Sequence, residues 1–252
     1  MGTTLLAIMF HIFLKAPQEW HLRTDQVEAL HISFFFGYWV IILLAEPITG
    51  AHYNPAITFA HLFKREAKFN KILCIFYLIA QFAGGFVGAV LGIFFTKHGA
   101  FLTIKNMDNS FLFQAVVIEI LASFIFTLIF LTQSEKTTRF SEDPALTYLF
   151  VSIGYSSCLA LTTPVSGGCI NPAIGLGLNL INFFDNGSKK SIEWIWVYTL
   201  MPFVGSLLAI LVYEAKFKQM QQQANDQHVI ENDFDSKRDE TVGMITGLIK
   251  FS

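Results

Sequence analysis

The chain has 252 residues, of which 53% are hydrophobic and only 14% are charged, and its formal net charge at pH 7 is −2. Charged residues make up about a quarter of a typical soluble domain, so this composition indicates a membrane protein. The near-neutral charge and the lack of a basic block exclude a nucleic-acid partner. Cys74, Cys158 and Cys169 form no CxxC pair, so we predict no disulfide framework, no metal site and no cofactor.

Long apolar segments follow one another along most of the chain. A helix needs about 20 residues to cross the hydrocarbon core of a bilayer. We therefore predict an all-α, multi-pass integral membrane protein with six transmembrane helices. The first predicted helix is short, and the six cover residues 2–14, 31–48, 72–95, 111–132, 144–163 and 192–213.

Two further apolar segments are shorter and begin with the same tripeptide. Asn54-Pro55-Ala56 opens residues 54–63, and Asn171-Pro172-Ala173 opens residues 171–183. An Asn side chain caps the free N–H groups at the start of a helix, and Pro at the first helical position loses no hydrogen bond. At 1.5 Å per residue, each segment covers roughly 15–20 Å, about half of the core. We predict two re-entrant half-helices.

The predicted elements form a duplication, with three spans and one half-helix in residues 1–95 and again in residues 111–213. Because three is odd, the second copy enters the membrane from the opposite side. The result is an inverted repeat whose half-helices meet head to head near the midplane.

Basic residues and the end of the chain predict an orientation. Eight basic residues fall in the segments on the same side as the amino terminus, against six in the opposite loops, which favours a cytoplasmic amino terminus. Residues 214–252 are rich in Gln, Asn, Asp, Glu and Lys. We predict a channel domain over residues 1–213 and a polar, flexible cytoplasmic tail over residues 214–252.

The two opposed half-helices predict that a pore between them would exclude ions. Each helix amino terminus carries about half a positive charge, so a cation or hydronium meets a barrier that a neutral hydrogen-bonding molecule does not. If the amide oxygens of Asn54 and Asn171 cap the helices, their NH₂ groups face the lumen and donate to passing oxygens. The alternative is that both residues are plain caps of buried helices.

Several motifs carry a family resemblance over nearly all of residues 2–213. Besides the two Asn-Pro-Ala motifs, they are Gly50-Ala51-His52, the sequence AQFAGG at residues 80–85, and Pro202-Phe203-Val204-Gly205. With these motifs the chain resembles the major intrinsic protein family, the aquaporins and aquaglyceroporins. The resemblance implies an aquaporin-like homotetramer in membrane lipid, with one pore per subunit for a small neutral permeant.

The chain also departs from the pattern of this family. Its first span lacks the glutamate that the family carries there, so the amino terminus is expected to be truncated relative to the family. By the family's spacing, the selectivity-filter arginine is replaced by Ile174 and the filter histidine by Leu159, while Phe34 and Gly168 occupy the other two positions. This filter has no charged side chain and no polar donor, which points away from strict water selectivity.

Two buried polar residues have competing interpretations. The resemblance implies that Glu119 accepts hydrogen bonds from a re-entrant loop, whereas an intramembrane carboxyl group could also relay protons. His52 is expected to bond loop carbonyls and to hold the first half-helix, and the alternative is a pH gate.

The leading functional hypothesis is a passive channel for water, small uncharged solutes of the glycerol or urea type, or both. The alternative is an ion-coupled secondary transporter, because inverted repeats with broken helices also build such carriers. The predicted spans contain no Ser/His pair, HExxH motif or paired acids, so the protein is not expected to be an enzyme.

Overall fold

The computed structural model describes residues 1–64, 70–105, 108–136 and 138–217, and near the carboxyl terminus residues 219, 222–223, 225–227, 229–234 and 237–238. Every regular element within these residues is helical, which confirms the all-α prediction. Arg65 and Lys68, which belong to the basic residues counted above, lie outside the described residues, as does much of the predicted tail.

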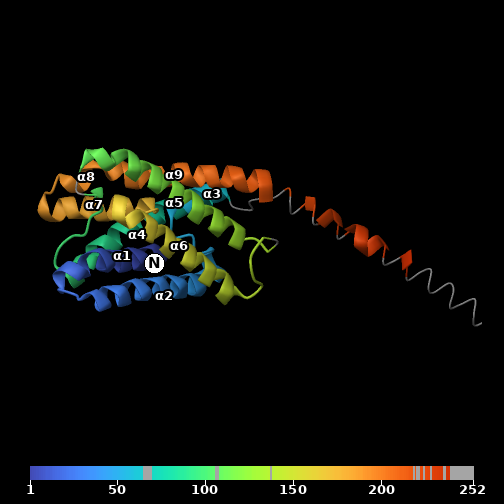
Figure 1. The fold of residues 1–252 in the computed structure, drawn as a ribbon, viewed down its shortest axis with the longest axis horizontal. Helices are drawn as coiled ribbons and strands as arrows, with labels where there is room; N and C mark the ends of the chain where they lie inside the picture. The colour runs from blue at the N-terminus through green and yellow to red at the C-terminus, as the bar shows by residue number, and fades with distance from the viewer. Residues whose placement is uncertain are drawn as a thin grey trace, which may run out of the picture. The chain divides into compact units, whose positions relative to one another are not determined.

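The described helices occur in the predicted order (Figure 1). The two half-helices are α3 (Pro55–Leu62) and α7 (Pro172–Asn186), and short turns are formed by η2 (Asn109–Phe111), α8 (Lys190–Glu193) and η3 (Tyr213–Phe217). The six longer helices are α1 (Gly2–Glu19), α2 (Thr24–Thr49), α4 (Lys71–Thr96), α5 (Leu112–Gln133), α6 (Pro144–Ser166) and α9 (Ile195–Val212). Five regions of the described chain are long and apolar enough to cross a membrane. The remaining long helix, α1, packs against α2 and α4.

The first two helices are longer than the sequence predicted. The expected first span ended at residue 14, but α1 continues to Glu19, where Lys15 pairs with Glu19 at 3.8 Å. The expected second span began at residue 31, but α2 begins at Thr24, where the backbone N–H of Arg23 donates to Gln26 Oε1 at 3.0 Å. In both places polar residues extend the helix beyond its apolar run.

The chain groups into two units, residues 1–211 and residues 212–252. In the second unit the described residues between 219 and 238 are helical, and those whose side chains are described are exposed. Lys237 Nζ lies 2.7 Å from Asp233 Oδ2, an ion pair one helical turn apart. The predicted division after residue 213 and the predicted flexibility of the tail stay predictions.

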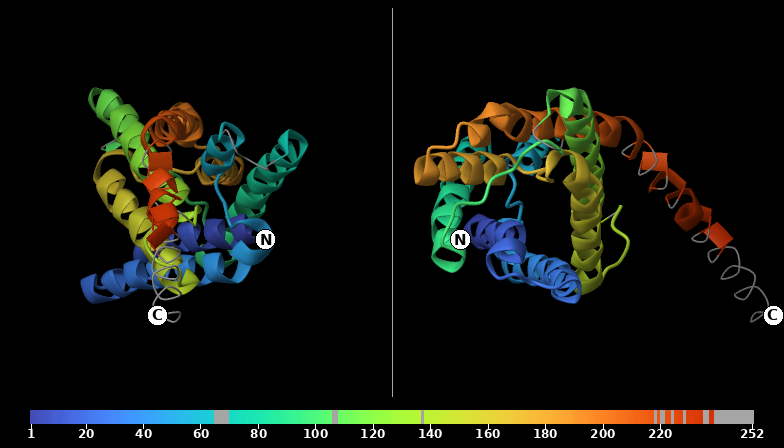
Figure 2. Two further views of the ribbon diagram at one scale, coloured as in Figure 1. Left: turned by 90° about the vertical axis from the view of Figure 1, so that its right-hand side faces the viewer. Right: turned by 60° about the vertical axis from the view of Figure 1, so that its left-hand side comes forward.

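Within the first unit, the long helices lie side by side and the half-helices enter between them from opposite ends (Figure 1). Helix α4 contacts α1, α3 and α7, while α5 contacts α6 and α3. Seen nearly end-on, α4 and α5 lie on different sides of the bundle (Figure 2, left). The half-helices are therefore enclosed by the long helices, as expected for an inverted repeat.

Glycines on α4 allow two of its neighbours to approach closely. A Cβ atom at Gly88 would lie 2.5 Å from the Thr4 carbonyl oxygen of α1, and one at Gly85 would lie 2.2 Å from the Ala173 carbonyl oxygen of α7. Real Cβ atoms do not come this close to backbone, so any larger residue would push the helices apart. Gly85 thus fixes the position of the first turn of α7.

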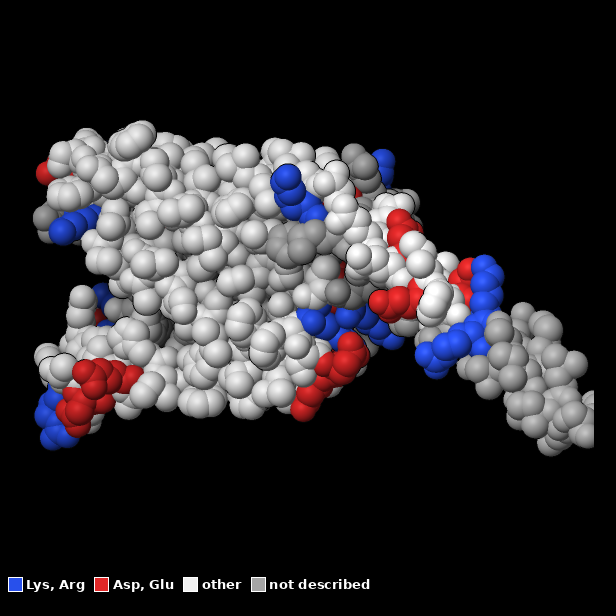
Figure 3. All heavy atoms as spheres, turned by 45° about the vertical axis from the view of Figure 1, so that its right-hand side comes forward, with Lys and Arg blue, Asp and Glu red and all other residues white. Residues whose placement is uncertain are grey.

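The outer surface of the bundle is apolar. On the face drawn in Figure 3, Lys, Arg, Asp and Glu gather toward the two ends of the helices, and a broad uncharged band lies between them. Large apolar side chains such as Ile48 and Phe94 are 81% and 80% exposed. Apolar exposure on this scale would promote aggregation in water, and it is what a surface facing lipid requires.

Candidate functional site

The two half-helices begin in the same way. Asn54 Oδ1 accepts a hydrogen bond from the Ala56 N–H at 2.9 Å, and Asn171 Oδ1 accepts one from the Ala173 N–H at 3.1 Å. A proline follows each Asn at the first helical position, where its missing N–H costs nothing. Both caps thus satisfy one free N–H of a buried helix end.

Each asparagine also reaches across to the opposite loop. Asn54 Nδ2 donates to the Ile170 carbonyl oxygen at 2.8 Å, and Asn171 Nδ2 donates to the Tyr53 carbonyl oxygen at 3.0 Å. Tyr53 and Ile170 both adopt left-handed backbone, with φ of 49° and 48°, so the two loops have matching local geometry. The amino ends of α3 and α7 are thereby joined to one another.

This arrangement limits what the asparagines offer to a permeant. If the amide oxygens cap the helices, both NH₂ groups were expected to face the lumen. In the structure, one N–H of each amide is committed to the opposite loop. Both asparagines are buried, and each retains one N–H that these bonds do not use.

The loop that precedes α3, here the first loop, is held by a buried polar cluster. His52 Nδ1 lies 3.1 Å from Thr58 Oγ1, and Gln81 Nε2 of α4 donates to the same hydroxyl at 2.8 Å. The His52 ring also lies 4.2 Å, between centroids, from the ring of His61 on α3. These contacts fix the loop against the half-helix that it precedes.

The loop that precedes α7, here the second loop, is held by Glu119 of α5. The Ser166 hydroxyl donates to Glu119 Oε1 at 2.6 Å, and the Ile170 N–H donates to Oε2 at 2.9 Å. The Tyr198 hydroxyl donates to the Ser166 carbonyl oxygen at 2.7 Å. Because Ile170 also accepts from Asn54, the carboxyl group of Glu119 supports the junction of the two half-helices through one residue.

The segment that follows α4 is bound to α7. Asn179 Oδ1 accepts from the Leu102 N–H at 2.8 Å, and Asn179 Nδ2 donates to the Leu102 carbonyl oxygen at 3.1 Å. Asp185 Oδ2 accepts from the Gly99 N–H at 2.9 Å. The chain between the two repeats therefore holds the half-helix of the second repeat in place.

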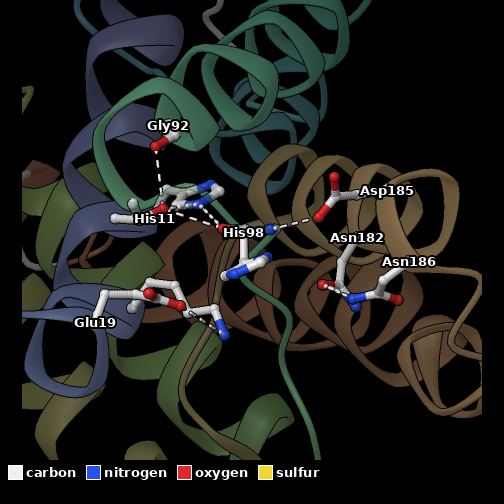
Figure 4. Close-up of polar contacts among 10 residues, drawn as sticks. His11, Glu19, Gly92, His98, Asn182, Asp185 and Asn186 are labelled. Carbon is white, nitrogen blue, oxygen red and sulfur yellow. Dashed lines mark hydrogen bonds and ion pairs between the residues drawn. The ribbon is translucent and has the colours of Figure 1, made fainter.

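A histidine of α1 binds the same segment from the other side. His11 is buried, and its Nε2 lies 2.9 Å from Thr96 Oγ1 and 3.1 Å from the His98 carbonyl oxygen. Figure 4 shows His11 and Asp185 reaching the segment around His98 from different helices. The segment thus links α1, α4 and α7.

The four expected filter positions are all buried. Phe34 and Leu159 lie together on the wall of a cavity of about 390 Å³ that also contacts His31, Ser156 and Thr163. A Cβ at Gly168 would lie 3.3 Å from the Leu159 carbonyl oxygen, so Gly168 is a neighbour of Leu159. Gly168 has φ of 75°, which explains why a glycine occupies it. Ile174 is buried in the first turn of α7.

Sequence reasoning missed the backbone partners of this site. The carbonyl oxygens of Tyr53 and Ile170 accept the two cross-bonds, and Asn179 anchors the segment after α4. The position of Tyr53 and Ile170 directly before the two asparagines was the one available signal. Asn179 gave none, because its partner lies 77 residues away in the chain.

Comparisons with known proteins agree on one family. The model of the major intrinsic protein family matches residues 1–213. The chain is similar to a probable aquaporin PIP2-5 of Arabidopsis thaliana, at 28% identity over 83% of this chain and 75% of that protein. It is also similar to a probable aquaporin PIP2-6 of Oryza sativa subsp. japonica, at 31% identity over 75% of this chain and 67% of that protein.

A solved structure matches the fold. The aquaglyceroporin from Plasmodium falciparum superposes with a TM-score of 0.73 and 19% sequence identity, covering 88% of this chain and 97% of that one. At this identity the similarity concerns the arrangement of helices, and it agrees with the predicted spans and half-helices.

Proposed function

Because the chain belongs to the major intrinsic protein family, we propose that it is a passive channel that conducts water and small uncharged solutes of the glycerol or urea type. Membership of this family makes the chain a multi-pass integral membrane protein in contact with lipid. It also makes the chain a channel for water or small solutes rather than an enzyme.

The exclusion of ions is the first part of the proposal, and the reciprocal bonds of Asn54 and Asn171 carry it. They support a pore in which the amino ends of α3 and α7 face one another. About half a positive charge from each helix then lies near the same point. A cation or proton is repelled there, while the oxygen of a neutral molecule accepts hydrogen bonds from the N–H groups that converge on this point.

The choice of permeant is the second part. The filter we propose consists of Phe34, Leu159, Gly168 and Ile174, and it carries no side-chain donor. Water gains from fixed donors at a constriction, and an apolar ring slows it by dewetting. A solute with its own CH groups loses less on such a wall. We therefore expect low or moderate water permeability together with passage of glycerol or urea.

Osmotic flux into proteoliposomes tests the permeant. The unmodified protein is compared with Ile174→Arg and with the conservative control Ile174→Val, after size-exclusion chromatography has shown that each variant is folded. We expect Ile174→Arg to suppress glycerol and urea more than water, and Ile174→Val to change none of them. Fast water flux with complete rejection of both solutes by the unmodified protein would contradict the filter assignment.

Conductance in planar bilayers tests the exclusion of ions. We expect at most a small residual leak of K⁺ or Na⁺, because the filter lacks the arginine that would add a second positive barrier. Large selective currents would refute the proposal. An ion-coupled transporter, the other function considered, would move solute faster when an ion gradient is imposed. A passive channel would not.

The proposal includes a homotetramer with one pore per subunit, as the family resemblance implies. Chemical cross-linking of the protein in detergent checks it. A ladder that ends at four subunits is expected, and a single band at the monomer position would contradict it.

A further inference from the structure

Aromatic side chains from four helices meet in the interior of the bundle. We call this group the aromatic plug, and its members are Phe10 of α1, Phe34 and Tyr38 of α2, Phe126 of α5 and Tyr155 of α6. Tyr155 lies at its centre, with ring centroids 4.5 Å from Tyr38, 5.0 Å from Phe126 and 6.2 Å from Phe34. Phe10 packs against Phe34 at 5.7 Å.

Helix geometry places the two tyrosines of this group between the filter and the paired asparagines. Tyr38 follows Phe34 by one helical turn, and Tyr155 precedes Leu159 by one turn, which is about 5.4 Å along each axis. Helices α2 and α6 run antiparallel, because Phe34 shares a cavity wall with Leu159 while Trp39 Nε1 bonds the Ala145 carbonyl oxygen. Both tyrosines are therefore displaced from the filter in the same direction.

That direction leads to the junction of the half-helices. The Tyr155 hydroxyl is buried near the side chain of Asn171, and it makes no hydrogen bond to any described residue. Tyr155 thus extends from the α6 side of the filter to the amide at the start of α7.

The plug leaves little room for water. Tyr38 is 1% exposed and Tyr155 is 0% exposed. The cavity of about 390 Å³ reaches Phe34 and Leu159, but neither tyrosine lies on its wall. Both tyrosine rings are therefore closed off from this cavity in the conformation described.

We propose that Tyr38 and Tyr155 close the pore between the filter and the asparagine pair, and that displacement of their rings limits the rate of permeation. This inference builds on the proposed function, since a plug limits flux only in a chain that conducts. The buried Tyr155 hydroxyl is the polar group that an entering water or solute hydroxyl meets next to Asn171. Tyr38 and Tyr155 then determine the permeation rate, in addition to the four filter positions.

Stopped-flow flux of water, glycerol and urea into proteoliposomes tests the plug. Tyr38→Ala and Tyr155→Ala each remove one ring, and the double variant removes both. Phe150→Ala is the matched control, because Phe150 is an aromatic residue of the same helix α6 that faces outward. We expect each tyrosine variant to raise flux per reconstituted protein several-fold, with the largest rise in the double variant, and the control to match the unmodified protein.

A conservative series separates ring volume from the hydroxyl group. Tyr155→Phe keeps the ring, so it should leave the pore closed and the flux no higher than in the unmodified protein. If Tyr155→Phe raised flux as much as Tyr155→Ala, closure by ring volume would be wrong. Tyr38→Leu and Tyr155→Leu replace the alanine variants if these fail to elute as folded protein, and a smaller rise in flux is expected of them.

The outcomes also distinguish this inference from the proposed function. If the unmodified protein conducts as fast as the double variant, the plug is wrong and the channel function stands. If neither protein exceeds empty vesicles for any of the three permeants, although both are folded and inserted, the proposed function fails and the plug fails with it.

Discussion

Replacement of Glu119 should destabilise the protein by an amount that depends on how many donors lose their acceptor. Glu119 is fully buried and accepts from the Ser166 hydroxyl and from the Ile170 N–H. A buried donor left unpaired costs about 1–3 kcal/mol. In Glu119→Gln the amide oxygen retains one bond while the NH₂ group faces the other donor, so the loss is about 1–3 kcal/mol. Glu119→Ala orphans both donors and loses about 2–6 kcal/mol.

Thermal unfolding in detergent, followed by tryptophan fluorescence, measures this loss. For a chain of this size 1 kcal/mol corresponds to about 2–4 °C in Tm, so Glu119→Gln should melt about 2–12 °C lower and Glu119→Ala about 4–24 °C lower. Glu28→Gln, at an exposed position of α2, is the matched control and should melt with the unmodified protein. If Glu119→Ala also melts with the unmodified protein, Glu119 does not hold the second loop.

A double-mutant cycle tests whether Glu119 and Asn54 act through the same residue, Ile170. Ile170 donates its N–H to Glu119 and offers its carbonyl oxygen to Asn54. Substitutions that act through a shared residue do not add. The Tm loss of Glu119→Gln combined with Asn54→Ala should therefore be smaller than the sum of the two single losses. Strict additivity would show that the carboxyl group and the amide act independently.

Two further substitutions probe the packing around α7. Gly85→Ala should lower the free energy of unfolding by about 1–3 kcal/mol, because its Cβ would meet the Ala173 carbonyl oxygen at 2.2 Å. The control Gly37→Ala should cost less, because its Cβ meets only the flexible end of a methionine. Equal melting temperatures for the two variants would contradict this reasoning. Asn179→Ala should raise hydrogen exchange at the Leu102 amide, which donates to Asn179, and unchanged protection there would show that the bond does not hold the segment.

Local patterns predicted the elements of the fold well. An Asn-Pro start and a short apolar run identified both half-helices, and the observed α3 lies within its predicted range. The start of α2 was predicted seven residues too late, because its first turn contains polar residues such as Asp25. Hydropathy alone does not distinguish a polar helical turn from a loop.

Contacts between distant residues could not be predicted in the same way. The sequence indicated Phe34 and Leu159 as filter positions through family spacing, and that assignment stays a prediction. It gave no sign that Tyr38 and Tyr155, one turn further along, pack ring against ring. Such contacts depend on the relative rotation of two helices, which periodicity within either helix does not specify.

The reciprocal bonds between the two loops constrain how the protein is made. The Tyr53 carbonyl oxygen receives its hydrogen bond from Asn171, which the ribosome adds 118 residues later. Until then, the Tyr53 carbonyl oxygen before the eight-residue helix α3 lacks this donor, and bare backbone groups are not tolerated in lipid. The first half-helix therefore cannot reach its final state during synthesis of the first repeat. The central junction needs both asparagines, so it forms only after the second repeat has been synthesised.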